Sequence, residues 1–335
     1  MTFENFIKIV HGSFQHQPTI KSFEKVETDP NRIKNGDLFL GNNVDDVKKA
    51  VQNGAYGIAS ERKLRVFDKE IAWIRVPSCE DVLIKLLRLS LLNRNVIFYN
   101  FSVVAFDILK KITTTKGAII FLEHDYTKDF KKIINAKNSA IFISCQKDFM
   151  DKIYPSYQTF NPKKFTYPIK SRKSSLFLTS FLYQNRQYED IKLPKIFLSK
   201  LEKVVNFLEE NQLQYDIYKL DFIEHFKPIF VTKKLKPKHF GTSQSTIILE
   251  KDINLIEEEL KFLLKEAAWS KIILFLPKEY KVKNIQYEKI IYYRKLEEIQ
   301  KLSSETFNFI LILADYNKLF QILNQINMEK QSSLF

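Results

Sequence analysis

Asn35-Gly36-Asp37-Leu38-Phe39-Leu40 is a turn that leads directly into an apolar run. Glycine accepts backbone angles that other residues avoid, so Gly36 suits the turn and residues 37–41 are expected to form a short strand. Apolar residues then recur at helical spacing over Val44–Gln52, and Gly54 stands where a glycine commonly ends a helix. A strand followed closely by a helix indicates a small α/β domain.

The same alternation extends on both sides and defines a first domain over residues 1–93. An opening helix is expected to end near His11. Ser78 can cap a later helix, with Asp81 at the capping-box offset. Further strands are expected at 56–59 and 71–76.

Residues 94–225 are predicted to form a second domain, in which short apolar runs alternate with helices. Strands are expected at 96–99, 118–122 and 140–145, with a helix at Val103–Ile112. This order predicts a parallel sheet that is covered on both faces. Further along the chain, we expect an irregular excursion at 154–173, a strand or hairpin arm at 175–183 and an amphipathic helix at 195–211.

Residues 226–335 are predicted to form a third domain with its own α/β sheet. Its expected strands are 229–232, 246–249, 271–276, 290–293 and 307–313, and its expected helices are 253–268 and 317–326. The predicted fold class is therefore α/β, in three domains with parallel or mixed sheets.

The composition limits the class of protein. A chain of 335 residues is too long for one typical hydrophobic core. Cys79 and Cys145 give neither a disulfide framework nor a metal-ligand spacing, which fits a reducing cytoplasm. No apolar run approaches the roughly 20 residues of a membrane span, and the start lacks the pattern of a signal peptide. The sequence therefore predicts a cytoplasmic protein with no membrane span and no metal site.

The formal net charge of +14 arises mostly from lysines spread among isoleucine, asparagine and phenylalanine residues. The densest group lies at 227–238, where proline and alternating lysines are typical of a solvated loop. A nucleic-acid partner is indicated by a basic face or stripe, which dispersed lysines do not form. Nucleic acid is therefore not expected as a partner.

The first domain resembles that of the Mur ligases, the ATP-dependent enzymes that add amino acids to the nucleotide-linked peptidoglycan precursor. Their pattern runs Asp-Ser-Arg, four variable positions, Gly-Asp-Leu-Phe, a strand, and a helix that ends in Gly-Ala. The matching positions here are Asp29, Gly36, Asp37, Leu38, Phe39, Gly54 and Ala55. The resemblance implies the three-domain order of these ligases, nearest to the type that adds D-alanyl-D-alanine.

The resemblance also implies a site for a UDP-muramyl peptide in the first domain. Its candidate binding residues are Asp29, Asn31, Arg32, Asp37, Phe39 and Asn42. Two positions depart from the family. Pro30-Asn31 replaces its Ser-Arg, with Arg32 one position later, and the segment 41–46 lacks its Asp-Gly-His.

The ATP-binding loop of these ligases, Gly-x-x-Gly-Lys-Thr, is matched in position but not in chemistry. The corresponding residues here are Phe101, Ser102, Val104, Ala105 and Phe106. Phe101 and Val104 stand at the glycines, where side chains prevent close approach of the backbone to phosphate. Ala105 replaces the lysine and Phe106 the threonine. The loop is degenerate, so neither ATP nor magnesium is expected as a cofactor, and no catalytic residue is predicted.

Three functions stay open at this point. The leading hypothesis is a non-catalytic relative in peptidoglycan precursor metabolism, which binds a UDP-muramyl peptide or a working cell-wall ligase. A diverged active ligase would instead need a different nucleotide site. The third is an adaptor that binds the sliding clamp or associates with nucleic acid. The final residues resemble the Gln-x-x-Leu-Phe peptide of clamp-binding proteins, with Gln331, Leu334 and Phe335 as the contacts.

The triplet Glu123-His124-Asp125 follows a predicted strand, where α/β sheets commonly place functional groups. A histidine flanked by carboxylates could act as a base or as a metal ligand. An isolated triplet at a strand end is more often a solvated turn, and we favour that interpretation.

Overall fold

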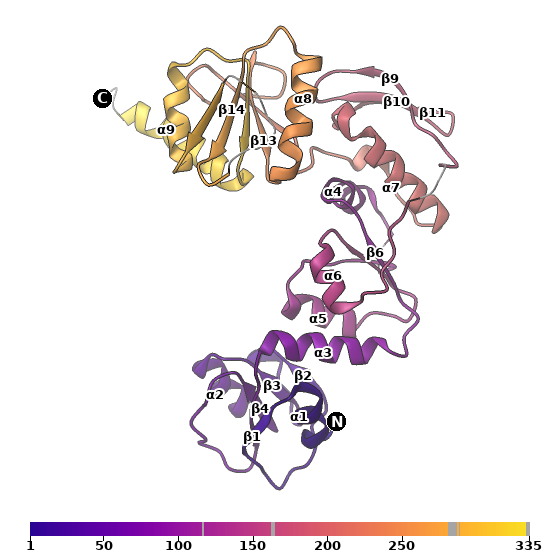
Figure 1. Ribbon diagram of the computed structural model, residues 1–335, viewed down its shortest axis with the longest axis vertical. Coiled ribbons are helices and arrows are strands. Elements are labelled where there is room, and N and C mark those ends of the chain that lie inside the picture. The colour runs from indigo at the N-terminus through magenta and orange to yellow at the C-terminus, as the bar shows by residue number, and fades with distance from the viewer. Residues whose placement is uncertain (116, 162–164, 281–286, 288, 333–335) are drawn as a thin grey trace. The chain divides into compact units, whose positions relative to one another are not determined.

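The computed structural model describes residues 1–115, 117–161, 165–280, 287 and 289–332 (Figure 1). The chain divides into two compact units. Unit 1 comprises Met1–Phe101 and Lys116–Thr159, and unit 2 comprises Ser102–Thr115 and Phe160–Phe335. Both combine helices with parallel and antiparallel strands, which confirms the predicted α/β class. The domain boundaries near residues 93 and 225 stay a prediction.

The first sheet of unit 1 is mixed. Its strands are β1 (Ser13–His16), β2 (Val26–Glu27), β3 (Leu38–Leu40), β4 (Gly57–Ser60) and β5 (Ala72–Arg75). They lie in the order β1-β5-β4-β3-β2, and every pairing is parallel except that of β1 with β5. The helices of this part are α1 (Phe3–Val10), α2 (Val44–Gln52) and α3 (Cys79–Leu91), with a 3-10 turn, η1, at Pro30–Arg32.

The second sheet of unit 1 is parallel, as its alternating pattern predicts. Its strands β6 (Ile97–Asn100), β7 (Ile119–Phe121) and β8 (Ile141–Ser144) lie in the order β6-β8-β7. The helices α5 (Tyr126–Ile134) and α6 (Lys147–Ile153) belong to it. Helix α3 lies between the two sheets of unit 1 (Figure 1), and its Leu83 and Leu87 share one core with Phe6 and Phe98. This shared core makes the two sheets one unit.

Unit 2 contains a small antiparallel sheet and a larger mixed one. The small sheet consists of β9 (Lys170–Ser174), β10 (Thr179–Tyr183) and β11 (Arg186–Ile191), in the order β11-β10-β9. The larger one consists of β12 (Lys227–Val231), β13 (Ser245–Glu250), β14 (Ile272–Pro277), β15 (Ile290–Tyr293) and β16 (Phe309–Leu313), in the order β12-β13-β16-β14-β15. Only β12 pairs antiparallel in the larger sheet.

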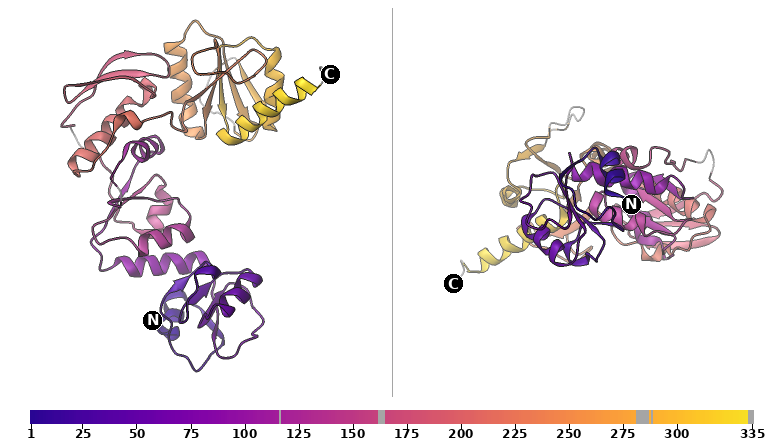
Figure 2. Two further views of the ribbon diagram at one scale, coloured as in Figure 1. Left: turned by 180° about the vertical axis from the view of Figure 1, so that it is seen from behind. Right: turned by 90° about the horizontal axis from the view of Figure 1, so that it is seen from below.

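The helices of unit 2 pack on these sheets and on one another. They are α4 (Val103–Ile112), α7 (Leu198–Glu210), α8 (Ile256–Glu266) and α9 (Tyr316–Ser332), with 3-10 turns η2 (Lys195–Phe197), η3 (Ile217–Lys219), η4 (Ile253–Leu255) and η5 (Leu296–Ser304). Helices α8 and α9 cover opposite faces of the larger sheet (Figures 1 and 2). Every residue of β13 and β14 is therefore buried, which explains their continuous apolar runs.

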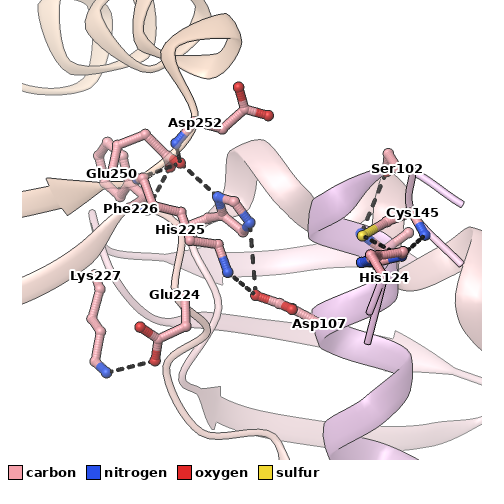
Figure 3. A network of polar contacts seen from close by, with 12 residues as sticks. Ser102, Asp107, His124, Cys145, Glu224, His225, Phe226, Lys227, Glu250 and Asp252 are labelled. Carbon is pink, nitrogen blue, oxygen red and sulfur yellow. Dashed lines mark hydrogen bonds and ion pairs between the residues drawn. The ribbon is translucent and has the colours of Figure 1, made fainter. Parts of the chain in front are cut away.

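A buried polar network lies at the carboxyl end of β13 (Figure 3). The side chains of Glu250 and His225 are both fully buried, and the His225 Nδ1 to Glu250 Oε1 distance is 2.6 Å. His225 Nε2 lies 3.7 Å from Asp107 Oδ2 on α4, and Lys251 Nζ contacts the same oxygen at 3.1 Å. The network joins α4, the segment before β12 and the end of β13 within unit 2.

Several predicted elements are confirmed, and others were missed. Helices α2 and α4 have the predicted bounds, and Ser78 caps α3 by accepting a hydrogen bond from Asp81 N. The missed elements are β1, β2, α5, α6, β9 and β11. Strand β9 begins at Lys170, inside the stretch 154–173 that was expected to be irregular. Helix α5 carried a readable signal, because Tyr126, Phe130 and Ile133 recur at helical spacing after the capping residue Asp125. The missed strands are short or polar, so only their pairing partners identify them.

Replacing Gly54 by alanine is expected to destabilise unit 1. Gly54 has a φ of +92°, and an added Cβ would lie 1.8 Å from Asn35 Oδ1. The left-handed backbone alone costs a residue with a side chain about 1–2 kcal/mol. Gly117→Ala is the matched control, because its φ is +80° but no atom lies within 4 Å of the added Cβ. Chemical denaturation should show the smaller loss for Gly117→Ala. Equal losses would mean that Asn35 moves aside at no cost.

Candidate functional site

A pocket of about 730 Å³ opens in unit 1 beside the loop that contains Asn31 and Arg32. Its walls come from Met1, the segment 23–34, helix α3 and the segment 130–135 at the end of helix α5. The lining residues are Met1, Phe23, Glu24, Lys25, Val26, Glu27, Asn31, Arg32, Ile33, Lys34, Leu86, Leu89, Ser90, Phe130, Lys131, Ile134 and Asn135. A concave site with an apolar lining and a few charged groups has the usual character of a ligand pocket.

The charge of the pocket is positive. Its cationic side chains are Lys25, Arg32, Lys34 and Lys131, and its carboxylates are Glu24 and Glu27. Four positive and two negative side chains leave a net charge of +2. Within the described part of the chain the Lys34 ammonium makes no ion pair, so it is available to a ligand. A concave surface of this sign attracts anions.

Glu27 holds the loop at 28–32 in place. Its Oε1 accepts hydrogen bonds from the backbone N–H groups of Thr28 at 2.8 Å and Asp29 at 2.9 Å. Lys131 Nζ of α5 lies 2.7 Å from the same oxygen. One carboxylate thus fixes the start of the loop and connects it to the opposite wall of the pocket. We class Glu27 as a positioning residue because its bonds go to the protein itself.

Asp29 shapes the next turn of the loop. Its Oδ1 accepts hydrogen bonds from Asn31 N at 3.0 Å and Asn31 Nδ2 at 3.1 Å, which caps η1. The hydrogen bond from Asn31 N is the main reason that the pKa of Asp29 lies below its ordinary value. Asn53 Nδ2 donates to Pro30 O at 2.8 Å from the other side. The loop is therefore pre-formed, so little conformational entropy remains to be lost when a ligand binds.

The Lys131→Met variant is expected to lower stability near neutral pH and much less in acid. Burial raises the pKa of Glu27, but the hydrogen bond from Lys131 and those from the backbone outweigh it, so the pKa lies below 4.5. A lowered carboxylate pKa contributes stability above 4.5 that disappears as the pH falls through the folded-state value. Urea denaturation of the wild-type protein and of Lys131→Met, at a series of pH values from acid to neutral, measures the effect.

Lys128→Met is the control for this variant, because Lys128 also lies on α5 but pairs with exposed Glu123. Exposed ion pairs contribute little to stability. A pH-independent loss in Lys131→Met would contradict the proposed role of the Glu27 carboxylate.

Of the six predicted binding residues, two line the pocket, two support its loop and two lie outside it. Asn31 and Arg32 line the pocket, and Asp29 supports them. Asp37 is fully buried, where its Oδ2 accepts a hydrogen bond from Lys34 N at 2.9 Å and lies 3.7 Å from Lys25 Nζ. It therefore positions two of the pocket's lysines.

The other two predicted residues lie outside the pocket. Phe39 is buried in a core with Trp73. Asn42 follows β3 and accepts hydrogen bonds from Ser60 Oγ at 3.0 Å and Glu61 N at 2.9 Å. Since Asp37 precedes β3 and Asn42 follows it, the two residues lie at opposite ends of one strand.

Sequence reasoning found only Asn31 and Arg32 among the residues that line the pocket. Glu27 lies just before the recognised pattern, and Lys34 stands at one of its variable positions. Phe130 and Lys131 belong to the unpredicted helix α5. The helical spacing of α5 was available in the sequence. The pairing of Lys131 with Glu27 was not, because it joins positions far apart along the chain.

The segment aligned with the phosphate loop is short and apolar. Strand β6 ends at Asn100 and α4 begins at Val103, so Phe101 and Ser102 alone connect them. Ser102 Oγ caps α4 by accepting a hydrogen bond from Ala105 N. The side chains of Phe101, Val104, Ala105 and Phe106 are all buried.

The triplet at 123–125 follows β7, and its three side chains differ in exposure and in their hydrogen-bond partners. Glu123 is exposed, and hydrogen bonds from Lys132 and then Lys128 lower its pKa to about 2. Asp125 caps α5, which agrees with the interpretation as a turn. His124 is half-buried and lies beside Ser144. Among the residues that the structure covers, no group of three or more His, Cys, Asp or Glu could hold a metal ion.

The predicted clamp contact at Leu334 and Phe335 lies outside the described residues, and Gln331 belongs to the last turns of α9. No helix of the described chain is both long enough and apolar enough to cross a membrane.

Two solved structures are similar to this chain over nearly their whole length. The MurF ligase from Thermotoga maritima in complex with ADP matches with a TM-score of 0.54 at 13% identity, over 92% of this chain and 98% of that one. The UDP-N-acetylmuramoylalanyl-D-glutamyl-2,6-diaminopimelate--D-alanyl-D-alanyl ligase from Acinetobacter baumannii matches with a TM-score of 0.51 at 11% identity, over 98% of this chain and 92% of that one. No family model and no curated protein matches the sequence. At these identities the similarity shows a shared fold.

Proposed function

We propose that this chain, which has a Mur ligase-like fold, is a non-catalytic cytoplasmic protein of peptidoglycan synthesis that binds a UDP-muramyl peptide. The pocket beside Asn31 and Arg32 carries the proposal, because a ready-made cationic site lies at the loop that resembles the precursor-binding domain. Lys34 and Arg32 suit a diphosphate, since charged donors make the stronger hydrogen bonds to phosphate oxygens. Leu86, Leu89 and Phe130 offer apolar surface to the rest of the ligand.

The absence of ligation rests on the connection between β6 and α4. A phosphate loop needs several residues of exposed backbone whose N–H groups point at the ligand, and a lysine at the start of the helix. Here two residues connect the elements, the side chain of Ala105 is buried, and the lysines of α4 are Lys110 and Lys111 in its last turn. This geometry supports a protein that holds the precursor without activating it.

Calorimetry with UDP-N-acetylmuramyl tripeptide, and separately with magnesium ATP, tests the proposal on the purified full chain. We expect heat of binding for the precursor and none for the nucleotide. ATP binding in the micromolar range would instead favour a diverged active ligase with a different nucleotide site. No heat of binding with either ligand would contradict precursor binding. A working cell-wall ligase would then be the partner to test.

A further inference from the structure

A second cavity, of about 950 Å³, opens in unit 2 and is lined by the end of α7, strand β11 and the segment 212–218. Its volume lies within the size range of small-molecule sites. Backbone hydrogen bonds tie the segment 212–218 to the end of α4 and the residues that follow it. Asp216 N donates to Ile112 O at 2.9 Å, and Thr114 N donates to Gln214 O at 3.0 Å. This wall is therefore formed before a ligand arrives, which lowers the entropy lost on binding.

An exposed tyrosine at the cavity is held in place by its neighbours. Tyr218 is 65% exposed, yet its hydroxyl donates to Gln187 O at 3.3 Å and its backbone N–H donates to Asp216 Oδ1 at 3.0 Å. Its ring lies 5.3 Å from that of Tyr188, which in turn stacks at 5.3 Å on the fully buried ring of Phe181. A chain of ring contacts thus leads from the core to the cavity. A large ring that is fixed but left open to solvent offers an apolar surface to a ligand.

The uncharged polar groups of the cavity are mostly side-chain amides. They belong to Gln184, Gln187, Gln212 and Gln214. Within the part of the chain that the structure describes, the side chains of Gln212 and Gln214 make no hydrogen bond to protein. A primary amide offers both donors and an acceptor, so it can bond a hydroxyl group in either direction. The lining is therefore suited to a ligand that carries hydroxyl groups.

The charged groups of the cavity do not select an anion. Burial, and then the hydrogen bond with Glu209, raises the pKa of Tyr215, so the Tyr215 hydroxyl stays protonated and donates to Glu209 Oε1. Among the described residues, Glu209 Oε2 has no hydrogen-bond partner, so it is available to a ligand as an acceptor. One positive side chain, Arg186, and two negative ones, Glu209 and Asp216, give a net charge of −1. The pocket of unit 1 has the opposite sign, so the two cavities are suited to different ligands.

We propose that this cavity of unit 2 binds a neutral saccharide, with the ring of Tyr218 against one face of a sugar ring. The amides of Gln212 and Gln214 and the carboxylate of Glu209 bond its hydroxyl groups. A sugar ring has a face of C–H groups that packs on an aromatic ring, and its hydroxyl groups both donate and accept hydrogen bonds. A nucleotide also stacks on an aromatic ring, but its phosphates require cations, which a net charge of −1 does not supply. The site goes beyond the proposed function, which concerns the cationic pocket of unit 1.

Saturation-transfer NMR on the full chain tests the proposal, with glucose, N-acetylglucosamine and cellobiose as the probes. We expect saturation transfer from the wild-type protein to the ring protons of at least one of these sugars. Tyr218→Ala should weaken that binding at least about tenfold, whereas Tyr218→Phe keeps the ring and should stay within about threefold of the wild-type protein. Glucose 6-phosphate should bind at least about fivefold more weakly than glucose, because the charge of the cavity repels it.

Tyr292→Ala is the matched control, because Tyr292 is an exposed tyrosine of the same unit that does not line the cavity. Its sugar binding should equal that of the wild-type protein. Gln214→Ala is a second test variant, since its side chain makes no hydrogen bond to the described protein, so a loss of binding reports a lost contact with the sugar. Circular dichroism checks the fold of each variant. The proposal would be overturned by no transfer to any of the three sugars, by equal binding in Tyr218→Ala and the wild-type protein, or by tighter binding of glucose 6-phosphate than of glucose.

Discussion

Glu250→Ala is expected to lower the free energy of unfolding of unit 2 by about 2–6 kcal/mol, because two fully buried donors lose their acceptor. The Glu250 carboxylate accepts hydrogen bonds from four donors: His225 Nδ1 at 2.6 Å, Phe226 N at 3.2 Å, Lys251 N at 2.8 Å and Asp252 N at 2.7 Å. Alanine would leave the buried donors of His225 and Phe226, and the partly buried amides of Lys251 and Asp252, without their acceptor. Each such loss costs about 1–3 kcal/mol unless water replaces the carboxylate.

The effect of Glu250→Ala should depend on pH. Burial raises the pKa of Glu250, but the hydrogen bond from His225 and the other donors outweigh it, so the pKa lies below 4.5. Burial, and then the charge of Glu250, raises the pKa of the neighbouring Glu259 well above 4.5, so Glu259 stays protonated and Glu250 carries the charge. The stabilisation by Glu250 is therefore present above 4.5 and is lost as the pH falls through its folded-state value.

Hydrogen exchange of peptides from β13, β14 and β16 measures the opening of unit 2 without requiring the whole chain to unfold in one step. Exchange should accelerate strongly in Glu250→Ala. Glu257→Ala on α8 is the control, because it removes only an i,i+4 pair with Lys261 at 2.7 Å. Such a pair contributes about 0.3–0.5 kcal/mol. Similar exchange in the two variants would mean that water satisfies the donors around residue 250.

The double variant Arg32→Glu with Lys34→Glu is expected to weaken binding of UDP-N-acetylmuramyl tripeptide by at least about 100-fold. Each charge-assisted hydrogen bond contributes about 1.5–3 kcal/mol, and each reversal adds repulsion of the diphosphate. Stability should change little, because both side chains are exposed at the pocket rim. Calorimetry gives the dissociation constant, and circular dichroism confirms the fold.

Lys48→Glu with Lys49→Glu is the matched control for this variant. Both lysines are exposed on α2 in the same unit, so the change in net charge is identical while the pocket is untouched. A purely long-range effect would weaken binding equally in both double variants and would fade with added salt. Equal losses would therefore contradict a contact between the ligand and Arg32 or Lys34.

The sequence by itself determined the elements whose cause is local. The α2 helix follows from apolar spacing and the glycine at 54, and the start of α3 follows from Ser78. Central strands such as β13 are continuous apolar runs because both of their faces are covered, so their composition identifies them. The apolar character of the segment 101–106 was also readable, because it follows from the residue types alone.

Only the tertiary structure decided which charges meet. Lys131 and Glu27, or His225 and Glu250, belong to separate elements, and no spacing rule relates them. Asp37 belongs to the recognised pattern. Its burial and its contacts with Lys25 and Lys34, however, depend on how β3 packs in its sheet. Local periodicity reports which face of an element is buried, whereas the partner on that face depends on how distant segments pack.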